Sequence, residues 1–178
     1  DGSMASSVTV GAGNTLNVCL NGHSCQRTHF KNSGTLNITD CQHSSANPGR
    51  FTGYTNTYNG DYSIDNASGS TLNMTNLNVS EASVLRMVDA KATITDCTFK
   101  NNTSSRPILW ALDGSDTASF FTVKKCTFTG NVDNDQNAND NYSRGTAVNS
   151  GCRGATLLED CTFDGNTSYG NGGAINLF

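Results

Sequence analysis

Cysteine thiols are the side chains of this sequence whose spacing suggests the clearest chemistry. The chain has seven cysteines, an odd number, so at least one thiol stays unpaired within a monomer. Cys19 and Cys25 are close enough in sequence to form a disulfide, which would suit an exported protein, although two free thiols are the alternative. Free thiols that pack as small apolar groups are expected at one recurring motif position: Cys41, Cys97, Cys126 and Cys161. No CxxC pair or HxxxH spacing indicates zinc, and His23 and His29 are expected in a solvated loop.

Oxygen ligands for a metal ion are concentrated in one polar segment. Asp133, Asp135 and Asn137 have the Asp-x-Asp-x-Asn spacing that begins a calcium-binding loop. However, the sixth position is Ala138 rather than glycine, and the twelfth is Arg144 rather than glutamate. We therefore treat the three residues as weak candidates and expect a solvated loop, with no metal and no cofactor.

Acidic side chains recur at one corner of a repeat rather than as a pair in a cleft. Asp40, Asp96 and Asp160 share this corner with Asn76 and Lys125, and we expect all five residues to cap turns. A glycosidase would need two carboxyl groups held together across a cleft. The sequence also lacks a phosphate loop, a nucleophile elbow and a histidine-based triad. We predict that the chain is not an enzyme.

The only tryptophan is a candidate ligand-binding residue if its side chain faces outward. If Leu85 and Leu109 point inward from adjacent strands, Arg86 and Trp110 lie side by side on the outside. The neighbouring outward positions would then be Asp65 below and Asn149 above. Trp110 and Arg86 could form a cation–π pair and a platform for a sugar ring or a protein partner.

The opposite register would bury this tryptophan. Ile108, Trp110 and Leu112 would then point inward together, and the indole would belong to the core. Burial removes a large apolar area from water, so the sequence leaves both registers open.

Two tyrosines are further candidates for ligand binding. Tyr54 and Tyr58 lie in a long excursion at residues 44–61, and loops of that length are often functional. Tyrosine supplies contact area at low entropic cost, so these rings could stack on a sugar or contact a protein. The alternative is that they cover the coil beneath them.

Five copies of one short unit indicate the architecture that positions these residues. Three close copies carry Cys97, Cys126 and Cys161, and two diverged copies carry Cys41 and Leu77. Apolar residues recur within a copy at a period of two, as in a strand. Successive copies are about 20 to 36 residues apart, the length of one solenoid turn with variable loops.

A second family of strands is predicted in the gaps between these copies. Its members are residues 62–65, 84–88, 108–112, 146–149 and 173–177. Two kinds of strand in a constant order are typical of a parallel β-helix, in which each strand pairs with its counterpart one coil away. We therefore predict an all-β parallel β-helix of about five to six coils with long loops.

Equivalent residues should stack in columns along this helix. The inward columns are predicted to be Ile38, Met74, Ile94, Val123 and Leu158, together with Phe99, Phe128 and Phe163. The asparagines that end the motif should stack at a bend, because an amide can donate to one coil and accept from another: Asn102, Asn131 and Asn166.

The last third of the chain carries motifs of a known family. The segments Phe128-Thr-Gly-Asn131 and Phe163-Asp-Gly-Asn166, followed by Gly172-Gly173-Ala174-Ile175, resemble the FxxN and GGA[ILV] motifs of the chlamydial polymorphic outer-membrane protein repeat. Residues 16–23 resemble the first coil of β-helix surface proteins of gut-type Gram-positive bacteria. The resemblance implies a right-handed β-helix with a surface, adhesive role, and it transfers no catalytic residues because the motif is structural.

Composition favours one domain of an exported protein. The 178 residues are 35% hydrophobic and 15% charged, enough to bury one core. A net charge of -4 without a stripe of Lys and Arg argues against a nucleic-acid partner. No apolar run approaches the ~20 residues of a membrane-spanning helix. We expect a location on the bacterial cell surface or secretion.

The chain is divided into three parts. Residues 1–4 are typical of a cloning remnant, residues 5–34 are expected to form an N-terminal cap and first coil, and residues 35–178 the repeats. The last copy stops in mid-coil, so we expect a segment excised from a longer surface protein. An uncovered strand edge there would favour end-to-end self-association.

Three functions remain as hypotheses. The first is a non-enzymatic adhesin segment that recognises a glycan or a host protein such as a mucin, an immunoglobulin or a matrix glycoprotein. The second is a polysaccharide lyase or hydrolase, which rests on analogy of fold alone. The third is a purely structural stalk.

Overall fold

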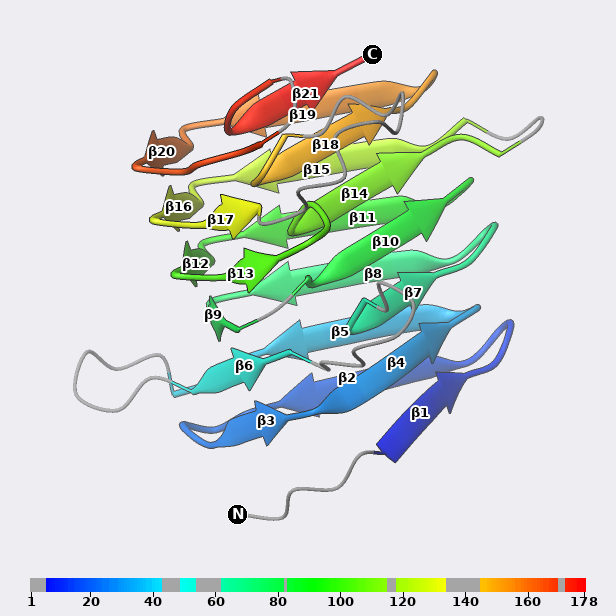
Figure 1. The fold of residues 1–178 in the computed structure, drawn as a ribbon. Coiled ribbons are helices and arrows are strands. Elements are labelled where there is room, and N and C mark those ends of the chain that lie inside the picture. The colour runs from blue at the N-terminus through cyan, green and yellow to red at the C-terminus, as the bar shows by residue number, and fades with distance from the viewer. Residues whose placement is uncertain are drawn as a thin grey trace.

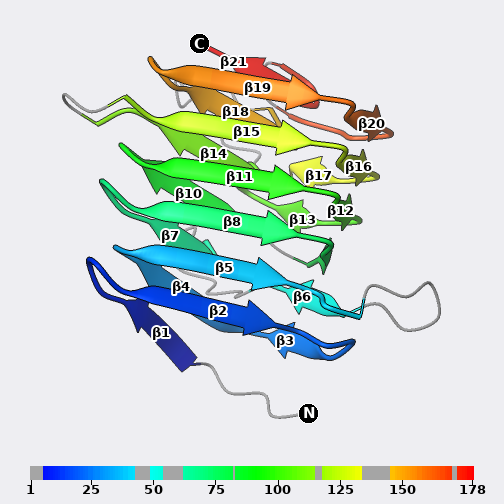
Figure 2. The same cartoon turned by 180° about the vertical axis from the view of Figure 1, so that it is seen from behind.

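The computed structural model is a right-handed parallel β-helix, seen from two sides in Figures 1 and 2. It describes residues 6–42, 49–53, 62–81, 83–114, 118–133, 145–169 and 172–178. Every strand pair in these ranges is parallel and joins equivalent strands of successive coils, as the fold prediction requires. No helix in the described ranges is long and apolar enough to cross a membrane.

Three sheets form the walls of the β-helix. Sheet A contains β1 (Ser6–Val10), β4 (Thr28–Asn32), β7 (Ile64–Asn66), β10 (Leu85–Val88), β14 (Leu109–Leu112), β18 (Val148–Gly151) and β21 (Ile175–Leu177). Sheet B, which faces the viewer in Figure 2, contains β2 (Thr15–Cys19), β5 (Thr35–Thr39), β8 (Thr71–Thr75), β11 (Lys91–Thr95), β15 (Phe120–Lys124) and β19 (Ala155–Glu159). Sheet C contains β3 (Ser24–Gln26), β6 (Arg50–Thr52), β9 (Asn78–Ser80), β12 (Thr98–Lys100), β16 (Thr127–Thr129) and β20 (Thr162–Asp164). A short extra pair joins β13 (Thr103–Ser104) to β17 (Val132–Asp133).

Each repeated motif forms two strands rather than the single strand that the sequence suggested. The break falls at the polar corner, where Asp96, Lys125 and Asp160 have φ values of 53°, 51° and 53°. This left-handed conformation turns the chain from sheet B into sheet C. One residue with positive φ is enough to end a strand. A full coil therefore has three walls: one strand in sheet B, one in sheet C and one in sheet A.

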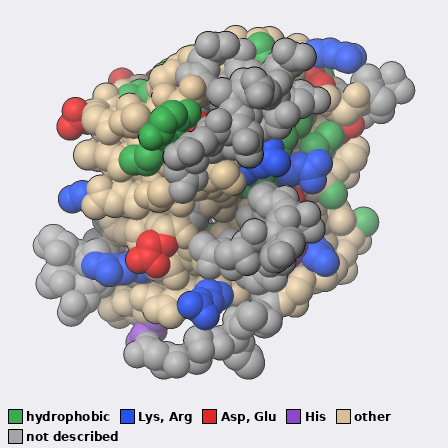
Figure 3. Space-filling model, viewed as in Figure 1, with side chains coloured by type: hydrophobic (Ala, Val, Ile, Leu, Met, Phe, Trp, Pro, Cys, Tyr) green, Lys and Arg blue, Asp and Glu red, His purple; other side chains and the backbone are tan. Residues whose placement is uncertain are grey.

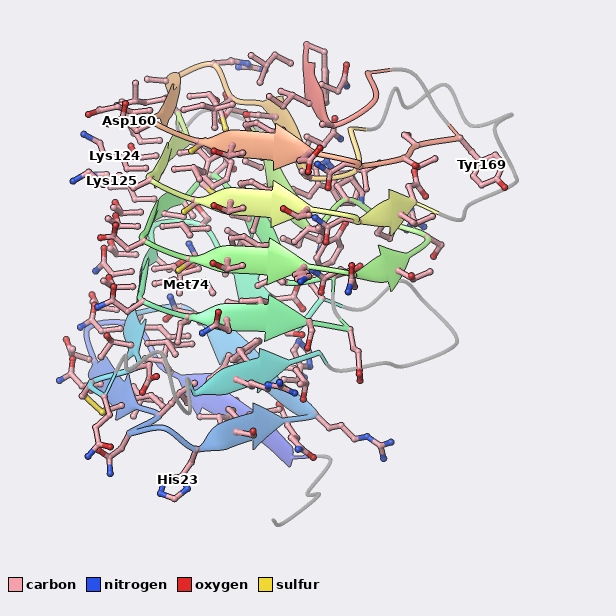
Figure 4. All side chains as sticks on the ribbon, turned by 90° about the vertical axis from the view of Figure 1, so that its left-hand side faces the viewer. His23, Met74, Lys124, Lys125, Asp160 and Tyr169 are labelled. Carbon is pink, nitrogen blue, oxygen red and sulfur yellow. A yellow bond between two sulfur atoms is a disulfide. The ribbon has the colours of Figure 1, made fainter. Side chains whose placement is uncertain are left out.

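Figure 4 shows the side chains of the corner residues Lys125 and Asp160, and of Lys124 at the end of β15, pointing away from the core. Lys124 Nζ lies 2.8 Å from Glu159 Oε2 on the next coil. The ion pair holds the pKa of Glu159 below its ordinary value. Asp96, Lys125 and Asp160 occupy the turn itself, in agreement with the role predicted for the corner, whereas Asp40 is buried and accepts hydrogen bonds from the N–H groups of Gly22 and Gly49.

Stacked apolar columns fill the space between the three walls. The register pairs Ile38 with Met74, Met74 with Ile94, Ile94 with Val123 and Val123 with Leu158, as predicted. The first four side chains are buried and Leu158, in the last coil, is half-buried. Figure 4 shows Met74 within the body of the β-helix.

Phenylalanines stack face to face on the inner side of sheet C. The ring centroids of Phe99 and Phe128 are 4.7 Å apart, and those of Phe128 and Phe163 are 4.9 Å apart. The rings are parallel within 4°. This spacing equals the separation of neighbouring strands, so the parallel register itself imposes the stack.

The predicted asparagine ladder is present at the bend after sheet C. Asn102 Nδ2 donates to Asn131 Oδ1 at 2.8 Å, and Asn131 Nδ2 donates to Asn166 Oδ1 at 2.7 Å. Asn131 and Asn166 also donate to the carbonyl oxygens of Phe99 and Phe128, at 3.1 and 2.9 Å. Each amide thus satisfies backbone groups of the coil below while it binds the amide beside it.

The disulfide between Cys19 and Cys25, which the sequence left open, is not formed. Cys19 is bonded to Cys41 on the next coil, with Cα atoms 5.7 Å apart, and Cys25 is a free thiol. Cys41 was expected as a free buried thiol, so that prediction is wrong. Stacking of successive coils, rather than closeness in sequence, brings Cys19 and Cys41 together.

The other thiols of the repeated motif are free, as expected. Cys97 and Cys126 are buried and Cys161 is half-buried. A hydrogen bond with Cys126, together with burial, raises the pKa of Cys97 well above its ordinary value. The same bond lowers the pKa of Cys126.

Some strands were not anticipated. Strand β6 lies inside the excursion at residues 44–61, of which the structure describes residues 49–53. Strand β4 contains His29, which was expected in a solvated loop. Both strands are stabilised mainly by pairing with distant coils, and pairing of that kind leaves little signal in the local sequence.

We expect Phe128→Ala to lower the free energy of unfolding by about 3–5 kcal/mol, because it leaves a cavity between two stacked rings. Denaturant unfolding measures this loss. Phe120→Ala is the matched control, since Phe120 is 47% exposed. Equal stability losses in the two variants would contradict the inward stack.

Asn131→Leu should also destabilise the fold. It removes the donors to Asn166 and Phe99 and the acceptor of Asn102, and each buried group left unpaired costs about 1–3 kcal/mol. Asn17→Leu, in an exposed asparagine pair on sheet B, serves as the control. A variant at position 131 as stable as the parent would contradict the ladder.

The disulfide can be tested by peptide mapping without reduction. Trypsin cleavage after Arg27, Lys31 and Arg50 places Cys19 and Cys41 in different peptides, which should remain linked. The double variant Cys19→Ser/Cys41→Ser should lose about 2–4 kcal/mol of stability. Recovery of the Cys41 peptide as a free thiol would contradict the pairing.

Candidate functional site

The candidate site is an outward-facing column of sheet A, which we call the sheet A column. It runs through Lys31, Asp65, Arg86, Trp110 and Asn149 on five successive strands. Asn176 continues it on β21. The register brings together the four sheet A residues predicted from the sequence, although they come from segments far apart in the chain.

The inward positions decide which way this column faces. Leu85 and Leu109 are fully buried, and Ala111 is buried beside them. Side chains alternate along a strand, so Arg86 and Trp110 lie on the other face of sheet A. The alternative register, with Trp110 and Leu112 inward, is therefore wrong.

Electrostatic contacts join the lower half of the column. Asp65 Oδ2 lies 2.9 Å from His29 Nε2, and Asp65 Oδ1 lies 3.9 Å from Arg86 Nη1. Arg86 is half exposed, whereas the His29 side chain is mostly covered. One carboxylate thus hydrogen-bonds an imidazole below it and lies near a guanidinium above it, and the guanidinium keeps donors that face solvent.

An open hollow lies beside these charged groups. It encloses about 460 Å³ and is lined by Lys31, Asn32, Ser33, Asp65, Asn66, Ala67, Ser68, Arg86 and Val88. Two cations, one carboxylate and the hydroxyl groups of Ser33 and Ser68 line it, whereas Asn32 and Asn66 are buried and hydrogen-bonded within the fold. Such a lining can hydrogen-bond a polar or anionic ligand, and it contains no nucleophile with an adjacent base.

The upper half of the column is more covered than the sequence suggested. Trp110 is half-buried, and its ring centroid lies 5.9 Å from that of the buried Tyr62. Asn149 is buried and its Oδ1 accepts a 2.8 Å hydrogen bond from Asn176 Nδ2. Trp110 therefore presents one part of its indole outward rather than the whole ring.

Several predicted residues cannot be placed in this site. Tyr54, Tyr58, Asp135 and Asn137 lie outside the described residues. Asp133 is buried in β17, where its N–H donates to the Thr167 carbonyl. Within the described ranges, no group of three or more His, Cys, Asp or Glu side chains is arranged to hold a metal ion.

Sequence reasoning missed Lys31 and His29. The signal was the alternation in β4, where Phe30 and Asn32 are buried and His29 and Lys31 take the outward positions. The strand was overlooked because it pairs with β1 and β7 instead of a neighbour in sequence.

Comparison with known protein families gives a match at the C-terminal end of the chain. Residues 160–177 match the Chlamydia polymorphic membrane protein repeat. No curated protein and no solved structure matches the chain significantly. The matched segment contains β20 and β21, with Phe163 at the end of the ring stack and Asn166 at the end of the ladder. The chain therefore carries a repeat like that of the polymorphic membrane proteins, built into a parallel β-helix.

Proposed function

We propose that this chain is a non-enzymatic ligand-binding segment of a bacterial cell-surface protein, and that it acts as an adhesin. The observation that carries the proposal is the sheet A column, where Lys31 and Arg86 face an open polar hollow on a rigid sheet. The match to a membrane protein repeat supports a location at the cell surface.

The ligand would be a glycan or a glycosylated host protein, such as a mucin, an immunoglobulin or a matrix glycoprotein. Arg86 is the principal contact in this proposal, because its planar guanidinium offers several donors in fixed directions. Asp65 lies near Arg86 on the strand below and could accept hydrogen bonds from sugar hydroxyls. The exposed part of Trp110 would supply apolar contact area above them.

The rigidity of the sheet favours binding by a preformed surface. Leu85 and Leu109 anchor the strands on the inside, so Arg86 and Trp110 keep their spacing without a ligand. A preorganised surface loses less conformational entropy on binding.

Arg86→Ala should abolish or weaken ligand binding without lowering the melting temperature, because Arg86 is half exposed. The measurement is a glycan array combined with immobilised mucin, immunoglobulin and fibronectin. Removing a central contact costs about 2 kcal/mol or more, which corresponds to at least about thirtyfold in affinity. Lys125→Ala is the matched control, because it removes one exposed cation at the corner between sheets B and C, away from the sheet A column.

Two outcomes would overturn the adhesin proposal. Release of reducing or unsaturated sugars from a polysaccharide would indicate a hydrolase or lyase instead. Absence of binding to every glycan and host protein tested would favour a structural stalk.

Trp110→Ala tests the upper half of the site separately. We expect a loss of binding together with a small fall in melting temperature, because the ring also contacts Tyr62. A fall of several degrees with unchanged binding would show that Trp110 has only a structural role, and the binding surface would then be confined to the hollow around Arg86.

A further inference from the structure

A second hollow surface lies on the outer face of sheet C, away from the sheet A column. Two adjoining hollows of about 410 and 270 Å³ share Arg50, Ser80 and Glu81 in their walls. We call this combined surface the sheet C groove. Figure 3 shows blue side chains with red between them over β3, β6 and β9, in the lower left of the view.

Parallel register aligns the groove with the axis of the β-helix. One outward column contains Ser24, Arg50, Asn78 and Thr98, and the next contains Gln26, Thr52, Ser80 and Lys100. Between these columns the inward Phe51, Val79 and Phe99 are buried. The floor of the groove is therefore held by the core, and a ligand would lie across successive coils.

The turns after these strands form one rim of the groove. Arg27, Glu81 and Asn101 follow β3, β9 and β12, with φ values of 50°, 59° and 53°. This conformation is uncommon for residues other than glycine, and Asn is among the residue types that adopt it most readily. The shared conformation places three polar side chains at equivalent points of the coils.

Positive charge exceeds negative charge in the groove. Among its described lining residues are Arg27, Arg50 and Lys100, against the single carboxylate of Glu81. All four side chains are exposed. Ion pairs of the described part of the chain involve none of these three cations. Within the described residues, Arg27, Arg50 and Lys100 are thus exposed cations without an ion pair, in a protein whose net charge is -4.

The spacing of the cations suits an extended anion. Arg50 on β6 and Lys100 on β12 are separated by one intervening strand, β9, which corresponds to about 10 Å along the axis. Arg27 lies one coil below Arg50. A compact ion such as phosphate would contact only one of these positions, whereas a chain molecule with repeated negative charges can contact all of them.

We propose that the sheet C groove binds an acidic polysaccharide, one whose sugars carry carboxylate or sulfate groups. The guanidinium groups of Arg27 and Arg50 can bind such groups with paired hydrogen bonds, and Lys100 adds a third charge. Asn78, Ser80 and Thr98 lie between the cations and can bind sugar hydroxyls.

The same lining is poorly suited to an acidic protein. The centres of protein interfaces are rich in aromatic and other large apolar contacts. The described lining of the groove has no aromatic side chain, and its main apolar member, Val79, points inward and is buried. Charge and hydroxyl groups therefore provide nearly all the recognition, which fits a charged saccharide.

The experiment measures binding of polygalacturonate and dextran sulfate, with neutral dextran and poly-glutamate for comparison. The double variant Arg50→Ala/Lys100→Ala should weaken binding of both acidic polysaccharides by at least tenfold. Affinity should also fall as salt is raised, because exposed charges are screened. The control Lys91→Ala/Lys125→Ala changes the net charge equally at exposed positions outside the groove, and should bind like the parent.

A second variant works in the opposite direction. Glu81→Gln removes the only carboxylate among the described lining residues while keeping the shape of the side chain, and should strengthen binding several-fold. Thermal unfolding of every variant confirms that the fold is retained. Because Glu81→Gln is expected to gain affinity, the result does not depend on a loss that misfolding could imitate.

Specific outcomes would overturn the proposal. Equal weakening by the two double variants would mean that only overall charge matters. Poly-glutamate bound as tightly as polygalacturonate would point to an acidic protein as the partner. Loss of acidic polysaccharide binding in Arg86→Ala would assign that ligand to the sheet A column, so the two proposals can fail independently.

Discussion

Parallel in-register stacking of equivalent residues is the constraint on which the rest of this structure depends. Each strand satisfies its backbone groups with the coils above and below it, so side chains at equivalent positions must lie about one strand spacing apart. Phe99, Phe128 and Phe163 can meet this condition because flat rings pack face to face at 4.7 to 4.9 Å. Asn102, Asn131 and Asn166 meet it because an amide is both donor and acceptor.

Stacking also separates the stability of the fold from its surface chemistry. Inward columns and asparagine ladders hold neighbouring coils together, so the outward positions can vary from coil to coil. On sheet A that variation yields Lys31, Asp65, Arg86 and Trp110 in one line. On sheet C it yields Arg50, Asn78 and Lys100 over a uniform apolar floor. Both proposed binding surfaces are therefore consequences of one arrangement.

Contacts between coils also explain why Cys19 is bonded to Cys41 rather than to Cys25. Cys19 ends β2 and Cys41 follows β5, and pairing of these strands brings the two thiols together. Cys25 is nearer to Cys19 in sequence, but it belongs to sheet C, on a different wall of the coil. Distance along the chain is a poor guide to proximity wherever the chain turns a corner every few residues.

The sequence by itself determined the parallel β-helix, because a repeated pattern with a period of two is visible without any long-range information. It also determined the inward columns and the asparagine ladder, because these residues recur at equivalent positions of the repeated motif.

Only the tertiary structure decided which of the two registers Trp110 takes, how far Tyr62 covers it, and which strands complete the walls. Strands β4 and β6 form through pairing with other coils, so local propensity could not reveal them. The pairing of Cys19 with Cys41, the contact of His29 with Asp65 and the alignment of Arg50 with Lys100 arise in the same way. Each depends on which residues the stacking of coils brings together, and that is a property of the whole solenoid rather than of any single segment.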